Sequence, residues 1–109
     1  MKKIIVSQPI EGKDIDEVAK TWQEAKKYLE SQDCEAVHGF VAQSDSLLRQ
    51  FGIKNKNLFN MSKFFENLSK CDGVYFTNGW TIDKNCRIAR LASIIYNLEI
   101  MEEEYEETD

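Results

Sequence analysis

The chain has 109 residues, of which 42% are hydrophobic and 30% are charged, a composition typical of one globular domain. Six of its 19 acidic residues lie in the last eight positions, so residues 1–101 carry 14 basic and 13 acidic residues. This near-neutral balance excludes the basic surface that duplex nucleic acids require. We expect residues 1–101 to form the domain and residues 102–109 to form an acidic, disordered tail.

Short apolar runs and sparse cysteines exclude other classes of protein. No apolar run approaches the ~18 residues of a membrane span, and Gln8, Pro9 and Glu11 interrupt the apolar start before a secretory signal can form. We therefore expect no membrane partner and a cytoplasmic location. The three cysteines form no Cys-x-x-Cys pair, which argues against structural zinc and against disulfides. We expect neither a metal nor a cofactor.

The first strand and the first helix have clear signals. Residues 2–7 form an apolar, β-branched run typical of a buried parallel strand, and Pro9 ends it. Asp14 and Glu17 have the spacing of a helix N-cap. Apolar residues then recur at intervals of three and four, which predicts a helix over 15–31.

The same periodicities predict the other elements. They are a strand over 36–41, a helix over 59–70, a strand over 73–77, a helix over 84–97 and a strand over 98–101. Gly39 weakens the first of these strands. Residues 43–58 are polar and irregular, with room for one helical turn, and suit an insertion or a lid.

Alternation of strands and helices, with connections long enough for crossovers, predicts an α/β fold. We expect a doubly wound, flavodoxin- or Rossmann-like parallel sheet of about four or five strands flanked by helices. Ligands of such sheets bind at the carboxyl ends of the strands, where the strand order reverses. If the first and third strands are neighbours, the loops over residues 7–13 and 77–85 face each other there. We therefore expect the functional site between these two loops.

The first of these loops carries groups suited to a phosphate or a sugar hydroxyl. Ser7 contributes a hydroxyl, Gln8 an amide, and Gly12 allows backbone N–H groups to turn toward a ligand. The loop matches neither the P-loop nor the Gly-x-Gly-x-x-Gly pattern. The candidate ligand-binding residues are Ser7, Gln8, Pro9, Ile10 and Gly12. The alternative is a tight turn in which Ser7 caps a local backbone group.

The second loop precedes a helix whose N-terminus favours an anion. Arg87 adds a planar fork of donors, and Trp80 offers a face on which a nucleobase can stack. The candidate ligand-binding residues on this side are Thr77, Asn78, Gly79, Trp80, Asn85 and Arg87. The alternatives are a solvated Arg87 and a Trp80 that fills the core or a subunit contact.

Two segments together carry a family resemblance. The first is Ile4-Ile-Val-Ser-Gln-Pro-Ile-Glu-Gly12, followed by a charged helix. The second is Leu68-Ser-Lys-Cys-Asp-Gly-Val-Tyr-Phe76, with Gly79-Trp80, Asn85-Cys-Arg-Ile88 and Tyr96-Asn-Leu-Glu-Ile100 after it. They resemble the nucleoside 2-deoxyribosyltransferase-like superfamily, in particular its small bacterial and phage branch. The resemblance implies a doubly wound sheet, a nucleoside or nucleotide pocket, N-glycosidic bond chemistry and homo-oligomers whose subunits help to line the site.

The resemblance also implies a catalytic glutamate on the last helix, close to the anomeric carbon of the sugar. This chain has Ala89 at that position, and Phe64 at the position of a second family carboxylate. Asn85 replaces the glycine that usually precedes the Cys-Arg pair. Glu11 and Asp83 are the weak candidates for a displaced catalytic acid. Because loss of a nucleophile costs several orders of magnitude in rate, we assign no catalytic residue.

These features favour a non-catalytic protein that sequesters or senses a nucleotide or nucleoside-derived small molecule, and that forms a homo-oligomer. An ADP-ribose-like or cyclic nucleotide signal would suit a phage protein that opposes a host defence. Two alternatives stay open. One is an active N-glycosidase or deoxyribosyltransferase that acts on nucleosides or nucleoside monophosphates. The other is a protein-interaction module that uses the acidic tail and a cluster of phenylalanines, Phe51, Phe59, Phe64 and Phe65.

Overall fold

A computed structural model describes residues 1–39 and 45–103 of the chain. Its elements in chain order are β1 (Lys2–Ser7), α1 (Ile15–Ser31), β2 (Cys34–Val37), α2 (Asp45–Gln50), α3 (Lys56–Leu68), β3 (Gly73–Phe76), the short 3₁₀ helix η1 (Trp80–Ile82), α4 (Lys84–Ile95) and β4 (Glu99–Glu102). None of the helices in the described ranges is long and apolar enough to cross a membrane.

The four strands form one parallel sheet in the order β2-β1-β3-β4. This arrangement confirms the expected Rossmann- or flavodoxin-like α/β fold. The first and third strands are neighbours, with Ile4 of β1 in register with Gly73 of β3. The strand order therefore reverses between β1 and β3, and their carboxyl ends form the switch point of the sheet.

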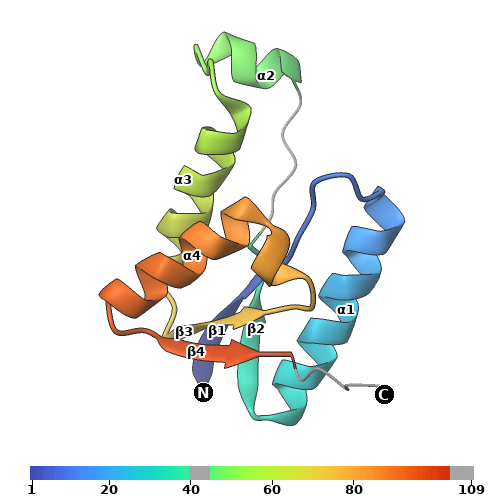
Figure 1. The fold of residues 1–109 in the computed structure, drawn as a ribbon, viewed down its shortest axis with the longest axis vertical. Helices are drawn as coiled ribbons and strands as arrows, with labels where there is room; N and C mark the ends of the chain where they lie inside the picture. Colours follow the sequence, from blue (N-terminus) through green and yellow to red (C-terminus); the bar gives the residue numbers. More distant parts are fainter. Residues whose placement is uncertain (40–44, 104–109) are drawn as a thin grey trace.

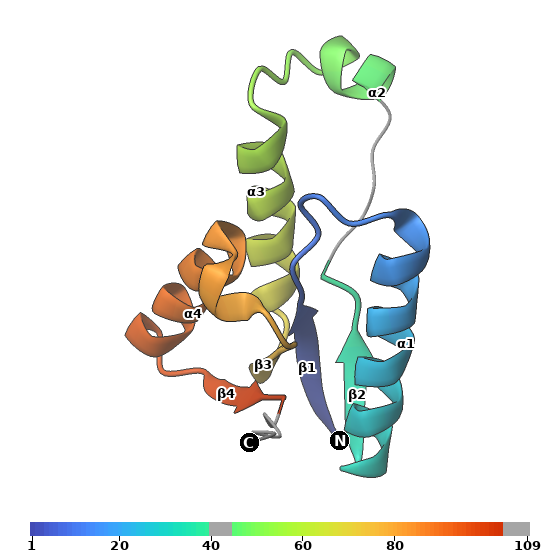
Figure 2. The same ribbon diagram turned by 45° about the vertical axis from the view of Figure 1, so that its right-hand side comes forward.

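Helices cover both faces of the sheet. Helix α1 lies on one face, and α3 and α4 lie on the other, while α2 sits away from the sheet (Figures 1 and 2). Alternate residues of β1 divide between two cores: Ile4 and Val6 pack with Leu29 of α1, and Ile5 packs with Phe64 of α3. The period of two in a strand thus supplies each layer with its own apolar contacts.

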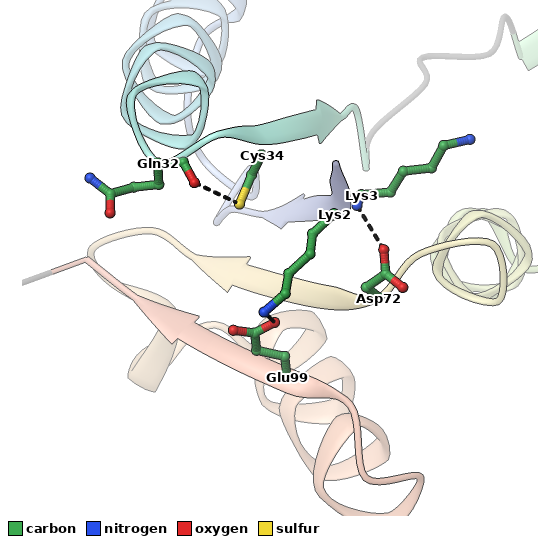
Figure 3. Close-up of polar contacts among 6 residues, drawn as sticks. All are labelled: Lys2, Lys3, Gln32, Cys34, Asp72 and Glu99. Atoms are coloured by element: carbon green, nitrogen blue, oxygen red, sulfur yellow. Dashed lines mark hydrogen bonds and ion pairs between the residues drawn. The ribbon is translucent and has the colours of Figure 1, made fainter.

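Polar contacts join the strands at the amino-terminal edge of the sheet (Figure 3). The backbone N–H of Lys3 donates to the Asp72 carboxylate at 2.9 Å, and the Lys2 ammonium lies 2.9 Å from the Glu99 carboxylate. Gly73 runs so close to β4 that a Cβ there would lie 2.5 Å from the Glu99 carbonyl oxygen. Glycine is therefore required at the start of β3.

Several element boundaries differ from the sequence predictions. Strand β2 is Cys34–Val37 rather than 36–41, because the chain resumes pairing directly after the turn at Asp33, where φ is 57°. Residues 40 and 41 lie outside the described residues. Helix α3 begins at Lys56, three residues before the predicted start, because the Asn55 side chain caps it by accepting the N–H of Leu58 at 2.9 Å.

The described part of the predicted tail is structured. Glu102 belongs to β4 and forms an ion pair with Arg90 of α4. The backbone N–H of Glu103 donates to the Phe76 carbonyl at 2.9 Å, which extends the β3–β4 pairing. Two residues that the sequence assigned to the tail, Glu102 and Glu103, thus take part in the β3–β4 pairing, and residues 104–109 lie outside the described part of the chain.

Helix α4 faces the core with its small residues. Cys86, Ala89 and Ser93 are its buried side chains. The larger apolar residues Ile88 and Leu91 of the same helix are exposed. The sheet side of α4 therefore takes small groups, and its large apolar residues point away from the protein.

Candidate functional site

The loops that follow β1 and β3 lie side by side at the switch point. The Thr77 N–H donates to the Ser7 carbonyl at 3.1 Å, so the two strands stay paired to their last residues. Gly79 has φ of 90°, and a Cβ built on it would lie 3.5 Å from Cγ of the buried Pro9. The expected meeting of the two loops is confirmed.

A small cavity opens on the α3–α4 side of this switch point, and we call it the β1–α4 cavity. Its enclosed volume is ≈ 50 Å³, enough for a few water molecules or one phosphate-sized group. It is lined by residues from β1, its following loop, α3, α4 and the segment after β2: Val6, Ser7, Gln8, Ile10, Gly39, Asn60, Met61, Lys63, Phe64, Asn67, Asn85, Cys86 and Ala89. Four of the predicted ligand-binding residues, Ser7, Gln8, Ile10 and Asn85, meet here.

Ser7 and Gln8 set the polarity of the inner end. Ser7 is 5% exposed, and its hydroxyl is hydrogen-bonded with the Cys86 thiol. Burial raises the pKa of Cys86 to about 12, with the Ser7 hydrogen bond as a smaller, opposing effect. Oε1 of Gln8 is buried and has no hydrogen-bond partner within the described residues. A buried acceptor without a partner is costly, and a bound hydroxyl group would satisfy it.

The cavity holds uncharged side chains at both positions where the resemblance implies carboxylates. Ala89 and Phe64 line it, and both are buried. None of its described lining residues is acidic. The Asp83 carboxylate instead caps α4 by accepting the N–H of Cys86 at 2.9 Å, and Glu11 is exposed and outside the lining set. Neither weak candidate faces the cavity.

The other predicted residues of the second loop lie elsewhere. The Trp80 ring packs at 5.6 Å from Phe76, and the Arg90 guanidinium covers it at 4.4 Å. Trp80 therefore has its own protein neighbours and no place in the cavity lining. Arg87 is exposed on the outer side of α4.

Thr77 belongs to the opposite face of the sheet. It lines a separate cavity of ≈ 340 Å³ beside α1, together with Tyr28 and Tyr75. Asn78 is exposed, and its N–H donates to the Glu103 carboxylate at 2.6 Å. The predicted ligand-binding residues are thus divided between the two faces of the sheet.

Helix α3 supplies cavity residues that sequence reasoning missed. Asn60, Lys63 and Asn67 lie three and four residues apart on one side of this helix, next to Phe64. Their spacing was a readable signal, since polar residues at helical period on an otherwise apolar helix side mark a polar opening. The Lys63 ammonium lies 3.3 Å from the Glu66 carboxylate at the rim.

Gly39, which the sequence identifies only as a residue that weakens the predicted strand over 36–41, also borders the cavity. A Cβ at this position would lie 2.3 Å from the Val6 carbonyl oxygen and 2.9 Å from the Phe64 ring. The residue therefore lets the segment after β2 approach the end of β1 and close one wall of the cavity.

Comparisons with protein-family models, with curated proteins and with solved structures give no match. Within residues 1–39 and 45–103, no three His, Cys, Asp or Glu side chains are grouped so that they could hold a metal ion. The deoxyribosyltransferase-like resemblance stays a prediction, and the residues of the cavity are the basis for the function proposed below.

Proposed function

We propose that this protein binds a nucleotide or a nucleoside-derived small molecule at the β1–α4 cavity and does not cleave its N-glycosidic bond. The ligand would be sequestered or sensed rather than transformed, as suits an ADP-ribose-like or cyclic nucleotide signal. The observation that carries this proposal is the composition of the cavity, which offers a hydroxyl, amides and an ammonium group but no acidic side chain among its described lining residues.

The polar groups suit the sugar–phosphate part of such a ligand. Ser7 and Gln8 lie at the carboxyl end of β1, where ligands of open parallel sheets bind. The unpartnered Gln8 oxygen accepts a hydrogen bond from a ribose hydroxyl. Lys63 at the rim, which pairs with Glu66 in the free protein, turns its ammonium to a phosphate. An oxocarbenium-like transition state requires a carboxylate nearby, so these groups support binding without hydrolysis.

The size of the cavity limits how the ligand enters. Pockets for small molecules usually measure about 300–1,000 Å³, whereas the enclosed space here is ≈ 50 Å³. In the present conformation it accepts one phosphate-sized group. A sugar or base needs the Met61 and Phe64 side chains to turn away from β1, so binding is coupled to a rearrangement on the inner side of α3.

Titration calorimetry against nucleoside monophosphates, cyclic nucleotides and ADP-ribose tests the proposal. Ser7→Ala removes one hydrogen-bonding hydroxyl, and we expect the Kd to rise about 2–10-fold. Ser93→Ala is the matched control, because Ser93 is also fully buried but bonds the Ala89 carbonyl at 2.7 Å inside α4. Absence of binding across the panel would contradict the proposal.

The alternative of an active N-glycosidase using Glu11 or Asp83 is separated by the products. Incubation with nucleosides and nucleoside monophosphates should leave them intact. Release of free base that disappears in Glu11→Gln or Asp83→Asn would establish the enzyme instead. Asp83→Asn keeps an oxygen for the α4 cap, so a loss of activity in that variant would not come from a frayed helix.

A further inference from the structure

Helix α4 exposes a continuous apolar stripe to solvent. Ile88, Leu91 and Ile95 follow one another at intervals of three and four residues, and Ile94 and Tyr96 flank them; these five side chains are between 48% and 76% exposed. The opposite side of the same helix is the buried one. An amphipathic helix that buries small groups and exposes large apolar ones is the reverse of an ordinary surface helix.

The stripe is a sizeable apolar patch. Its five side chains present roughly 500 Å² of apolar surface, within the ~300–600 Å² of the largest patch on a typical monomer, and such patches are often functional. An apolar groove of ≈ 600 Å³ between α3 and α4, lined by Phe65, Leu68, Leu98 and Tyr96 among others, continues it. Two such stripes facing each other would bury about 1,000 Å², below the ~1,200–2,000 Å² of specific interfaces, so the pairing also needs contacts around the groove.

The cations of α4 lie near its start. They are Lys84 and Arg87, beside the capping carboxylate of Asp83, and the last turn has no basic residue. Cations are favoured at the carboxyl end of a helix, so the end of α4 can accept a cation from a neighbour. An antiparallel helix reverses the sign of the neighbour at each end. The cations then face the carboxyl terminus of the partner helix and its Tyr96 ring.

We propose that α4 pairs with α4 of a second copy of this chain, antiparallel about a two-fold axis near Leu91. In this arrangement the apolar stripes cover each other, and Arg87 faces the carboxyl end of the partner helix rather than a ligand. The partner is a second copy because the surface is self-complementary under this symmetry. The apolar centre of one helix packs on the apolar centre of the other, and the basic amino-terminal end lies against a carboxyl-terminal turn without basic residues. The inference goes beyond the proposed function and does not depend on it, since the cavity lies on the other side of α4.

Sedimentation velocity on the full chain tests the pairing. We expect a mass near twice 12.7 kDa, and a monomer after Leu91→Glu, with the Kd of the dimer raised roughly 100-fold. The matched control is Leu58→Glu, because Leu58 is 67% exposed on α3, outside the stripe, and should leave the dimer intact. If Leu91→Glu lacks the helical circular dichroism signal of the folded protein, Ile95→Lys is used as the test variant instead.

The direction of the pairing has its own test. The double variant Lys84→Glu/Arg87→Glu should raise the dimer Kd roughly tenfold, whereas Lys20→Glu/Lys27→Glu on the exposed side of α1 should not change it. A wild-type chain that sediments as a monomer at every concentration overturns the proposal. So does a dimer that survives both stripe variants.

Discussion

Helices α1 and α4 cover opposite faces of the same sheet, and they bury opposite kinds of residue. Helix α1 turns Val18, Ala25 and Leu29 toward the strands. Helix α4 turns Cys86, Ala89 and Ser93 toward the strands, while its leucine and isoleucines remain outside. The difference follows from what else fills each side, because the α4 side already carries Phe76 of β3, Phe64 of α3 and the Trp80 ring of η1.

Each face of the sheet has its own cavity. Small side chains on the buried side of α4 leave a space of ≈ 50 Å³ beside Ser7, and the α1 face has the separate cavity of ≈ 340 Å³ beside Tyr28 and Tyr75. Because α4 packs on the sheet with its small residues, its large apolar residues remain exposed. The same helix therefore serves two proposed roles: its inner side lines a pocket, and its outer side forms a subunit contact.

The same substitution on the two helices gives the largest expected difference. Leu29→Ala removes a fully buried side chain, so the free energy of unfolding should fall by about 2–5 kcal/mol. Leu91→Ala removes a side chain that is 60% exposed, and the protomer should lose no more than about 0.5 kcal/mol. Urea unfolding at a protein concentration below the dimer Kd measures both. Equal losses would break the contrast between the helices.

Alkaline pH should weaken the fold through groups packed beneath α4 and α1. Burial raises the pKa of Cys86 from 9.0 to about 12 and that of Tyr75 from 10.0 to about 12. Between these pKa values the unfolded chain loses protons that the folded chain keeps. The contribution of these two groups to the free energy of unfolding is therefore fully present below pH 9 and is lost as the pH rises toward 12. Each group contributes a slope of at most about 1.4 kcal/mol per pH unit.

Two variants separate these contributions. Cys86→Ala should reduce the loss between pH 9 and 10, where Cys86 titrates together with Cys71, whose pKa burial also raises, and Tyr75→Phe should reduce only the loss above pH 10. Urea unfolding curves at pH 8, 9.5 and 11 give the slopes. A free energy of unfolding that stays constant up to pH 11 would show that neither group is held protonated by the fold.

The two helix caps give the smallest effect and should be equal. Asp14 accepts the N–H of Glu17 at 2.8 Å, and Asp83 accepts the N–H of Cys86 at 2.9 Å. Replacing either aspartate by alanine should lower the free energy of unfolding by about 1 kcal/mol. Thermal unfolding monitored by circular dichroism compares them. A much larger effect at Asp83 would mean that its carboxylate does more than cap α4.

Local signals in the sequence predicted most of the fold. The helix over 15–31 has both a capping aspartate and an apolar stripe, and its predicted and observed limits agree. The switch point was expected on the condition that the first and third strands are neighbours, and the β1–β3 pairing meets that condition. The helix signals depend on residues close together in the chain, so one sequence is sufficient to find them.

The orientation of α4 could not be predicted in the same way. Its sequence contains two stripes at helical spacing, one of small residues at 86, 89 and 93 and one of large residues at 88, 91 and 95. Hydrophobicity alone assigns the larger stripe to the core. The choice depends on how much space the sheet and α3 leave, which is a property of the assembled molecule. The covering of Trp80 by Arg90 escaped prediction for the same reason.

An NMR titration of the full chain with nucleotides and ADP-ribose tests the central claim most directly, because one series of spectra reports both binding and cleavage. We expect shifts of the amide signals of Ser7, Gln8 and Asn85–Ala89 that saturate with ligand, while the anomeric proton signal of the ligand keeps its intensity. Amide signals that stay unchanged, shifts confined to the outer side of α4, or the appearance of free base would contradict a binding site without cleavage at the β1–α4 cavity.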